Sequence, residues 1–371
     1  MKSNIKLITA FAVLSTSLYA TNGDHLIGIG AKSLGMAGTG IAISHGAESA
    51  LANPALITAV KSKEISFGGT MFMPDVETNT GSGFQQSDAD FSVIPAVSLA
   101  MKATDNFYWG VGMWGTAGMG VDYRGTGVNY EMVTNLQLMQ FGLPLAYTDN
   151  GFSIGVTPIL QYGALDMSYT NSSTKGVAQD LAFGYTVGAA YNVSDVTLGL
   201  VYKSPIKMTY DGQIARAAVD FSVSGLSDDL EQPSEMGAGI AYEMGRSVIA
   251  LDYKRINWES AAGYKDFGWK DQDVFAIGYQ HTQDAWAIRA GYNYAKSPIV
   301  NNANGNINML NLLGFPATVE SHYAVGGSYA FTKKTSVDVA YVYAPEASDT
   351  LGNTSTKHSQ SALSMQVTFD F

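Results

Sequence analysis

From about residue 64 to its end, the chain alternates apolar and polar residues in short runs divided by turn residues. The last run shows this most clearly. One of its faces is polar (Ser364, Gln366, Thr368 and Asp370), and the other is apolar (Leu363, Met365, Val367, Phe369 and Phe371). Successive side chains of a strand point to opposite sides of the sheet. The pattern therefore predicts strands with lipid on one face and a polar lumen on the other.

Fourteen such strands are predicted, an even number, at 64–76, 90–103, 106–123, 131–148, 151–170, 181–193, 195–212, 233–244, 246–258, 271–282, 284–298, 319–331, 334–346 and 357–371. Tight turns alternate with long connections near 77–89, 213–232 and 299–318, as short periplasmic turns and long outer loops do in outer-membrane barrels. No apolar run is long enough for a spanning helix. We predict an all-β fold, a 14-stranded antiparallel transmembrane β-barrel in the outer membrane.

The composition agrees with a barrel in a membrane. Only 14% of the 371 residues are charged, while the chain holds 40 Gly, 21 Tyr and 16 Phe, which is unusual for a soluble enzyme. A net charge of −11 argues against nucleic acid as a partner, and the absence of Cys excludes disulfides and thiolate metal sites. Aromatic residues near strand ends are expected in the two interfacial girdles, namely Tyr108, Trp109, Tyr253, Trp258, Tyr292 and Tyr294.

The first 62 residues follow other rules. Residues 1–20 have a positive start (Lys2, Lys6), an apolar core and a small-ended exit, which predicts a signal peptide cut after Ala20. Residues 21–62 have no strand period and are rich in Gly, Ala and Ser, with a bend at Asn53-Pro54-Ala55. We predict that they form a compact hatch, or plug, inside a barrel made by residues 63–371.

Several motifs carry a resemblance that covers essentially the whole mature chain. They are Ser33-Leu34-Gly35-Met36-Ala37-Gly38, Asn53-Pro54-Ala55-Leu56-Ile57-Thr58, Pro233-Ser234-Glu235-Met236, the run from Trp286 to Tyr292 followed by Ser297-Pro298, and Ser336-Val337-Asp338-Val339 after the turn at Thr332. In this order they resemble the outer-membrane long-chain fatty-acid transporter family, which includes the aromatic-hydrocarbon transporters. The resemblance implies a 14-stranded barrel with a hatch whose Asn-Pro-Ala motif is Asn53, Pro54 and Ala55.

The resemblance also implies a kinked third strand that opens a lateral gap beside the hatch. Gly115, Gly118 and Gly120 are the candidates for that kink, because glycine in a strand marks a bulge or a close backbone approach. They could equally be glycines that pack against the plug. Prolines in neighbouring strands, at 95, 144 and 158, each remove a ladder donor, so this side of the barrel should be irregular. We also expect the Asn-Pro-Ala turn to dock near the third strand.

The function implied is uptake of long-chain fatty acids or other hydrophobic compounds, by gated diffusion and lateral release into the bilayer. A carboxylate ligand would need a cation in an apolar pocket. The candidates are Lys270, which could instead be a solvated loop charge, and Arg289, which could instead pair with Asp252 or Asp338. The alternative function is a water-filled porin for small polar solutes. The expected partners are outer-membrane lipid, lipopolysaccharide and the barrel assembly machinery, with the protein a monomer.

No enzyme chemistry is predicted. The five histidines are scattered, and no HExxH, G-x-S-x-G or phosphate-binding glycine loop occurs. His322 with Ser328 or Ser364 is the only material for a nucleophile and base, and a lone histidine in a lumen is more often a hydrogen-bonded wall residue. We therefore expect no catalytic residues, no metal site and no cofactor.

Overall fold

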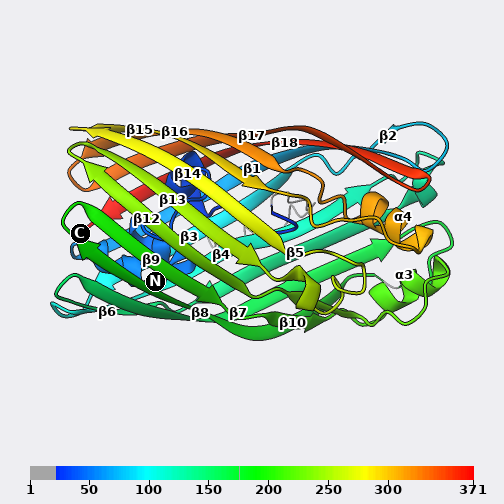
Figure 1. Ribbon diagram of the computed structural model, residues 1–371, viewed down its shortest axis with the longest axis horizontal. Coiled ribbons are helices and arrows are strands. Elements are labelled where there is room, and N and C mark those ends of the chain that lie inside the picture. Colours follow the sequence, from blue (N-terminus) through cyan, green and yellow to red (C-terminus); the bar gives the residue numbers. More distant parts are fainter. Residues whose placement is uncertain (1–21, 175) are drawn as a thin grey trace, which may run out of the picture.

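The computed structural model describes residues 22–174 and 176–371, so the predicted signal peptide at 1–20 lies outside the described residues. The chain forms one closed antiparallel barrel, in which β18 pairs with β1 to complete the ring (Figure 1). In the described part of the chain, no helix is long and apolar enough to cross a membrane.

The wall consists of 14 strands, as the pattern predicts, with β5 and β6 as two halves of the fourth. In order they are β1 (Lys63–Asn79), β3 (Ser92–Lys102), β4 (Phe107–Asp122), β5 (Val133–Gly142), β6 (Leu145–Asp149), β7 (Phe152–Ser168), β8 (Ala178–Val193), β9 (Val196–Lys203), β12 (Glu235–Met244), β13 (Ser247–Ile256), β14 (Gln272–Gln283), β15 (Trp286–Ala295), β16 (Ser321–Thr332), β17 (Thr335–Leu351) and β18 (Thr354–Asp370). The predicted facing of the last strand is confirmed, since Ser364, Gln366 and Thr368 are buried.

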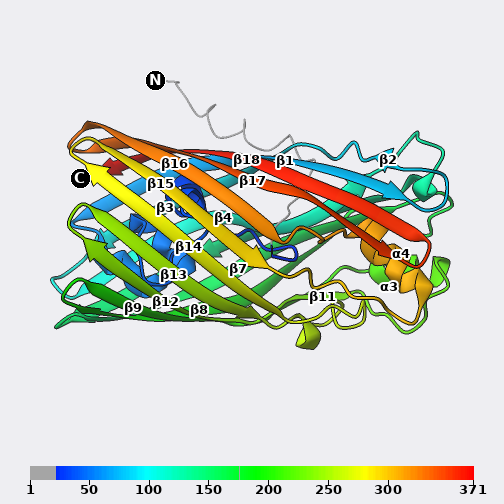
Figure 2. The same cartoon turned by 45° about the horizontal axis from the view of Figure 1, so that its top comes forward.

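The remaining elements are short, and one of them, β2, pairs with the end of β1. In the loops they are β2 (Gln85–Gln86), η3 (Asn129–Glu131), β10 (Ile206–Thr209), α3 (Ile214–Asp220), β11 (Asp229–Gln232), η4 (Trp258–Ser260) and α4 (Gly305–Gly314); in the hatch they are α1 (Gly30–Gly35), η1 (Gly46–Glu48), α2 (Ser49–Ala52) and η2 (Pro54–Ala59). Figure 2 shows the hatch inside the end of the barrel that carries the C-terminus, with α3 and α4 at the opposite end.

Three strand predictions need correction. The seventh strand was expected to reach residue 212, but β9 ends at Lys203, because Pro205 has no N–H to donate to the ladder. The last hairpin is longer than expected, with β17 continuing to Leu351 and β18 beginning at Thr354. The fourth strand is interrupted between Gly142 and Leu145, where Pro144 lies, so this side of the barrel is irregular as predicted.

The girdle prediction was wrong for two residues. Trp258 is fully buried, because the chain turns into the lumen after β13 ends at Ile256. Tyr108 is also buried, at 6% exposure, on the inner face of β4. The other four predicted girdle aromatics, Trp109, Tyr253, Tyr292 and Tyr294, are exposed or half-exposed, as lipid-facing side chains should be.

The hatch lies against a belt of inward-facing glycines on seven of the wall strands. Going around the wall, the hatch contacts Gly326 on β16, Gly291 on β15, Gly278 on β14, Gly239 on β12, Gly199 on β9, Gly188 on β8 and Gly155 on β7. A Cβ atom on Gly291 would lie 2.5 Å from the backbone carbon of Met36. Because glycine has no side chain, the backbones of hatch and wall can approach this closely.

Wall carboxylates and amides complete this contact by accepting hatch N–H groups. Asp252 Oδ2 accepts from the N–H groups of Gly40 (2.8 Å) and Ile41 (3.0 Å). On the other side of the barrel, Glu64 Oε1 accepts from Ala47 N (2.8 Å) and Gln366 Oε1 accepts from Ala31 N (3.0 Å). The loop-like backbone of the hatch therefore finds many of its hydrogen-bond partners in the barrel wall.

The outer half of the lumen is filled by loop residues. Trp258, Tyr264 and Trp269 pack with ring centroids 4.6–5.0 Å apart, and α4 covers them with its buried leucines. Trp269 Nε1 donates to Asn311 Oδ1 on α4 at 2.9 Å. The outer mouth is thus closed by an apolar aromatic cluster and not by an open ring of charges.

The glycine belt generates the first testable prediction. In Gly155→Ala, the new Cβ would lie 2.5 Å from the backbone carbon of Pro54, which no side-chain rotation can relieve. We expect about 1–3 kcal/mol of strain, and cleavage of the hatch several-fold faster in limited proteolysis of the folded barrel. The matched control is Gly327→Ala, whose Cβ would have its nearest neighbour at 3.6 Å. Equal proteolysis of the two variants would show that the belt does not hold the hatch.

Candidate functional site: a break in the wall closed by the chain's N-terminal segment

The ladder between the second and third wall strands is incomplete. Pairing of β3 with β4 ends at Ala96 and Trp114, although β4 continues to Asp122. On its other side, β4 shifts register against β5 between Gly115 and Ala117, which leaves Thr116 as the extra residue of a bulge. A bulge bends its strand and changes the direction in which the edge of the strand faces. Beyond Gly115, β4 therefore departs from β3 and its edge faces a new partner.

That partner is the segment 22–26, which we call the N-terminal segment. Leu26 N donates to Thr116 O and Gly118 N donates to Asp24 O, each at 3.1 Å. His25 forms an isolated antiparallel bridge with Ala117 between these two hydrogen bonds. The segment thus replaces the missing strand over a short stretch, with few main-chain bonds, so it can leave without unfolding the barrel.

The three candidate kink glycines have different surroundings. Gly115 lies at the bulge, where a Cβ would come 2.7 Å from the Cγ2 atom of Ile94 on β3. Gly118 donates its N–H to the N-terminal segment, as described above. Gly120 pairs in register with Asn135 on β5. The structure therefore puts the bulge at Gly115 and the hydrogen bond to the N-terminal segment at Gly118, while Gly120 pairs with β5 but, like the other two, lies beyond the last pair with β3.

A buried polar network anchors the N-terminal segment to the opposite wall. Asp24 accepts a hydrogen bond from Tyr264 Oη and, at 2.9 Å, one from Gln232 Nε2. His25 Nδ1 lies 2.7 Å from Glu235 Oε1, and the other carboxylate oxygen of Glu235 lies 3.2 Å from Lys203 Nζ. Two hatch residues thereby bind groups on β11, β12 and the loop after β13, and Glu235 extends the network to Lys203 on β9.

The imidazole of His25 has an acceptor beside each nitrogen. Nε2 lies 2.5 Å from Gln232 Oε1 and Nδ1 faces Glu235. Burial opposes a charge here, but the neighbouring carboxylates of Glu235 and Asp24 outweigh it, and the pKa of His25 is raised above its usual value. A positively charged His25 therefore suits this position.

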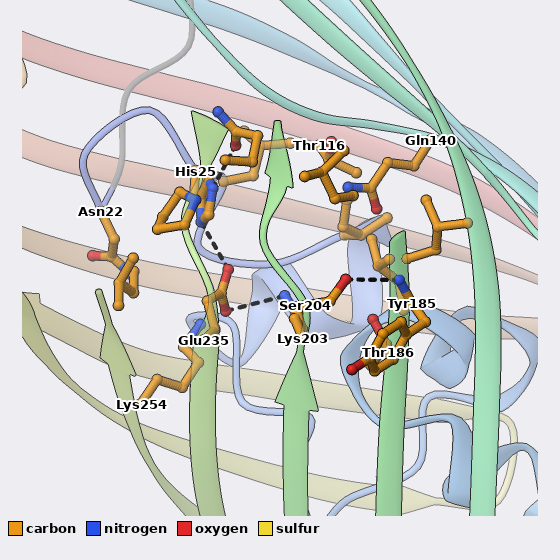
Figure 3. A pocket seen from close by; sticks show the side chains of 18 residues that line it. Asn22, His25, Thr116, Gln140, Tyr185, Thr186, Lys203, Ser204, Glu235 and Lys254 are labelled. Carbon is orange, nitrogen blue, oxygen red and sulfur yellow. Dashed lines mark hydrogen bonds and ion pairs between the residues drawn. The ribbon is translucent and has the colours of Figure 1, made fainter. Parts of the chain in front are cut away.

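A cavity of about 60 Å³ lies beside this network (Figure 3). Its lining joins the two sides of the barrel, from Thr116 on β4 to Tyr185 on β8, and includes Lys203, Glu235 and Lys254. Figure 3 shows His25 above Glu235, with Lys203 and Lys254 on either side of Glu235. The volume suits a few water molecules or a small polar group.

Several polar atoms around this cavity lack a hydrogen-bond partner among the described residues. They are both amide atoms of Asn22, the Oγ1 atoms of Thr116 and Thr186, and Gln140 Oε1. Lys254 also has no acid within 4.0 Å in the described part of the chain, whereas Lys203 is paired with Glu235. Buried polar groups are normally satisfied, so this cavity suits a polar guest. Lys254 is the cation best placed to meet an anionic one.

The Asn-Pro-Ala motif holds another part of the hatch. Asn53 Oδ1 caps η2 by accepting from Ala55 N (3.1 Å), and Pro54 occupies its first turn. The Asn53 amide nitrogen donates to Ile41 O (2.7 Å) and to Ala189 O on β8 (3.1 Å). The motif therefore docks on β7 and β8, the fifth and sixth wall strands. The helix η2 that it opens also packs toward the third strand, β4, since Ile57 shares a buried apolar cluster with Tyr108 and Trp114.

The two predicted head-group cations lie apart from the cavity. Arg289 is buried under α1, donates to Gln280 Oε1 (2.6 Å) and Ser328 Oγ (2.5 Å), and lies 3.6 Å from Asp338 Oδ1. Lys270 is half-exposed in an outer loop, with Nζ 3.3 Å from Glu259 Oε1. Arg289 therefore makes the wall-acid pairing with Asp338 that the sequence left open.

Sequence reasoning missed the polar network itself. Lys203, Glu235 and Lys254 occupy lumen-facing positions of β9, β12 and β13, so their parity on the strands was a usable signal. Asp24 and His25 gave none, because their partners follow more than 200 residues later.

The network generates the second prediction. In Glu235→Gln the carboxylate that pairs with both His25 and Lys203 is lost, and breaking a buried pair costs about 3–5 kcal/mol. We expect hydrogen exchange of the Leu26 and Gly118 amides to accelerate by at least about tenfold. The control is Asp229→Asn, which removes the partner of the exposed Lys207 and should change exchange little. Unchanged protection in Glu235→Gln would exclude this network as the anchor of the N-terminal segment.

Comparisons with known proteins agree with this architecture. The long-chain fatty acid transport protein of Salmonella typhi is 24% identical over 91% of this chain and 90% of its own length. The 47 kDa outer membrane protein of Pasteurella multocida (strain Pm70) is 22% identical, with the same coverage of 91% and 90%.

Solved structures show the same fold. A Pseudomonas aeruginosa FadL homologue superposes with a TM-score of 0.74 at 16% identity, covering 94% of this chain and all 100% of its own. The toluene transporter TodX of P. putida superposes with a TM-score of 0.70 at 18% identity, covering 93% and 99%. The family described as "Outer membrane protein transport protein (OMPP1/FadL/TodX)" matches residues 12–240 and 250–370. This match spans most of the sequence and confirms the resemblance: the chain belongs to the OMPP1/FadL/TodX family of outer membrane transport proteins.

Proposed function

We propose that this protein takes up long-chain fatty acids or other hydrophobic compounds and releases them sideways through the break beside β4. The observation that carries the proposal is the N-terminal segment, which closes that break with two main-chain hydrogen bonds and one polar anchor. Family membership makes the chain an outer-membrane transporter and not an enzyme. Relatives named as fatty-acid and toluene transporters support a hydrophobic cargo.

The proposed route begins at the outer aromatic cluster around Trp258 and Trp269. A hydrophobic molecule is favoured there because each buried methylene gains about 0.8 kcal/mol. It then moves toward the cavity at Lys254, from which displacement of the N-terminal segment uncovers the edge of β4. Release into the bilayer is downhill for an apolar cargo, so the route requires no energy source.

A water-filled porin is the less favoured function. The outer half of the lumen is packed with buried apolar side chains and the inner half is occupied by the hatch. A porin needs a continuous aqueous path lined with polar groups. Planar-bilayer recordings provide the comparison, because a steady resting current would support the porin and saturable uptake without current would support the transporter.

The proposal also includes the partners of the protein in the membrane and its oligomeric state. The exposed apolar band of the wall would contact outer-membrane lipid, and its outer rim lipopolysaccharide. The barrel assembly machinery would insert the chain, which we infer to act as a monomer. The hatch motif Asn53, Pro54 and Ala55 would hold the hatch on β7 and β8 while the N-terminal segment moves.

A disulfide across the break tests the proposed exit. The chain has no native Cys, so Leu26→Cys/Thr116→Cys can form only the intended bond, beside the Leu26 N to Thr116 O contact. We expect oxidation to slow uptake of a labelled fatty acid by at least about twofold and a reductant to restore it. Each single-Cys variant is the control. Full uptake by the oxidised barrel would exclude release at this break.

Replacement of lysines tests whether the cargo carries a carboxylate. Lys254→Met should weaken binding of a long-chain fatty acid by about 1.5–3 kcal/mol, roughly 10- to 150-fold, because a charge-assisted hydrogen bond is lost. Lys270→Ala should weaken it less, since that side chain is half-exposed and screened. Binding of the matching uncharged alkane, measured by fluorescence displacement, should not change. Equal losses for both ligands would instead favour a neutral hydrocarbon cargo.

A further inference from the structure

The wall has a second discontinuity, between β8 and β9. β8 has 16 residues and β9 only eight, and their last pair is Thr186 with Lys203. Residues 178–185 of β8 therefore extend beyond β9, and among the described residues no strand pairs with them on that side. β12 and β13 stop at the same level, since Lys203 pairs with Glu235 and Glu235 with Ile256.

We call the level at which β9, β12 and β13 end beside β8 the step, and this level lies within the part of the wall that faces lipid. With a rise of about 3.3 Å per residue and a tilt of about 40°, the eight residues of β9 span roughly 20 Å, less than the apolar band of about 25 Å. The uncovered edge of β8 carries apolar side chains, with Phe183 81% and Leu181 59% exposed. Such side chains are suited to hydrocarbon and not to water.

The chain that should cover this edge turns inward instead. After Pro205, β10 pairs only with β11, in a separate two-stranded sheet. Met208 of β10 and Tyr210, which follows it, pack on the inner face of β7 at Gly163. Ser204 and Thr209 hold the paired strands β10 and β11, which we call the β10–β11 ribbon, on β8. We call the contact between Ser204 and Tyr185 the clasp. Ser204 N donates to Tyr185 O and Ser204 Oγ accepts from Tyr185 N, both at 2.9 Å, and Thr209 N donates to Asp180 Oδ2 at 2.8 Å.

Cavities lie on both faces of the wall at this step. The inner cavity is lined by Tyr185, Thr186, Lys203 and Ser204, as Figure 3 shows for these four residues. On the lipid side lies an apolar hollow of about 690 Å³, lined among others by Val187, Tyr202 and Met236. The two spaces are therefore lined by adjacent residues of the same strand ends, and the Ser204 clasp is next to both sets in the chain.

We propose that this step is a second lateral exit, through which a ligand with an apolar chain or ring, and at most one charged group small enough for the inner cavity, leaves the lumen for the bilayer. It opens when Ser204 releases the edge of β8 and the β10–β11 ribbon moves further into the lumen. The same cavity reaches Thr116 at the first break and Tyr185 at the second. The inference rests on the proposed function, that the protein carries hydrophobic ligands.

A disulfide at the clasp tests it. Tyr185→Cys/Ser204→Cys replaces the two residues that already share two hydrogen bonds. The matched control is Ile277→Cys/Tyr292→Cys, a lipid-facing pair where the wall is continuous. The measurement is the rate at which a pyrene-labelled fatty acid reaches the bilayer of proteoliposomes. Heat-modifiable migration of the reduced forms checks that both barrels fold.

We expect oxidation to slow transfer by about two- to tenfold in the clasp variant and not in the control, as loss of one of two exits would. Ser204→Ala, which removes the accepting hydroxyl, should accelerate transfer by a similar factor. Unchanged rates in both clasp variants, with active wild-type protein, would overturn the second exit alone. An inactive wild-type protein would overturn the proposed function, and with it this inference.

Discussion

The constraint on which this structure depends is that hydrocarbon offers no partner to a backbone N–H or C=O group. The barrel meets it by closing β18 on β1 and by pairing nearly every strand with two neighbours. Wherever the ladder fails, something from the lumen must cover the exposed edge. The N-terminal segment does so beside β4, and Ser204 with the β10–β11 ribbon does so beside β8. Both covers have far fewer hydrogen bonds than a strand, so they are the places where the wall can open at low cost.

The hatch and the outer loops fill the lumen by different physical means. The hatch is made of small residues that lie backbone to backbone on the glycine belt, with wall groups such as Asp252 and Glu64 accepting its N–H groups. Its first residues, 22–26, are held on β4 by only two main-chain hydrogen bonds, so a local shift of this segment breaks few contacts with the wall. The outer cluster around Trp258 is large and aromatic. An apolar cargo is therefore favoured at the outer aromatic cluster, and the hatch, part of which can move, lies beneath that cluster.

Much of this fold could be predicted from the sequence, because a strand with one lipid face repeats a simple period. The strand number, the facing of β18 and the irregularity at Pro144 all follow from residues that are neighbours in the chain. The inward turn after Lys203 could have been anticipated from Pro205, but the direction it takes depends on packing of Met208 against β7. Trp258 was assigned to a girdle because sequence alone does not show where a strand leaves the wall.

The site was less predictable for a related reason. Its geometry depends on contacts between residues far apart in the chain, such as Asp24 with Tyr264, and on where the hatch meets the wall. The bulge at Gly115 was anticipated from the glycine run and the family resemblance, whereas docking of Asn53 on β8 was not. Lumen-facing charges on β9, β12 and β13 were visible in the strand parity, but their common cavity appears only when the barrel closes.

The central claim is that the N-terminal segment leaves the edge of β4 when a hydrophobic ligand binds. Spin labels at Leu26→Cys and Asp105→Cys, the second in the exposed turn between β3 and β4, allow the distance to be measured by double electron–electron resonance in this Cys-free chain. We expect one distance between the two labels in the empty barrel, and a second population of molecules with a longer distance when a fatty acid or hydrocarbon is added. A single distance that does not change at saturating ligand, in protein that still transports it, would contradict this mechanism.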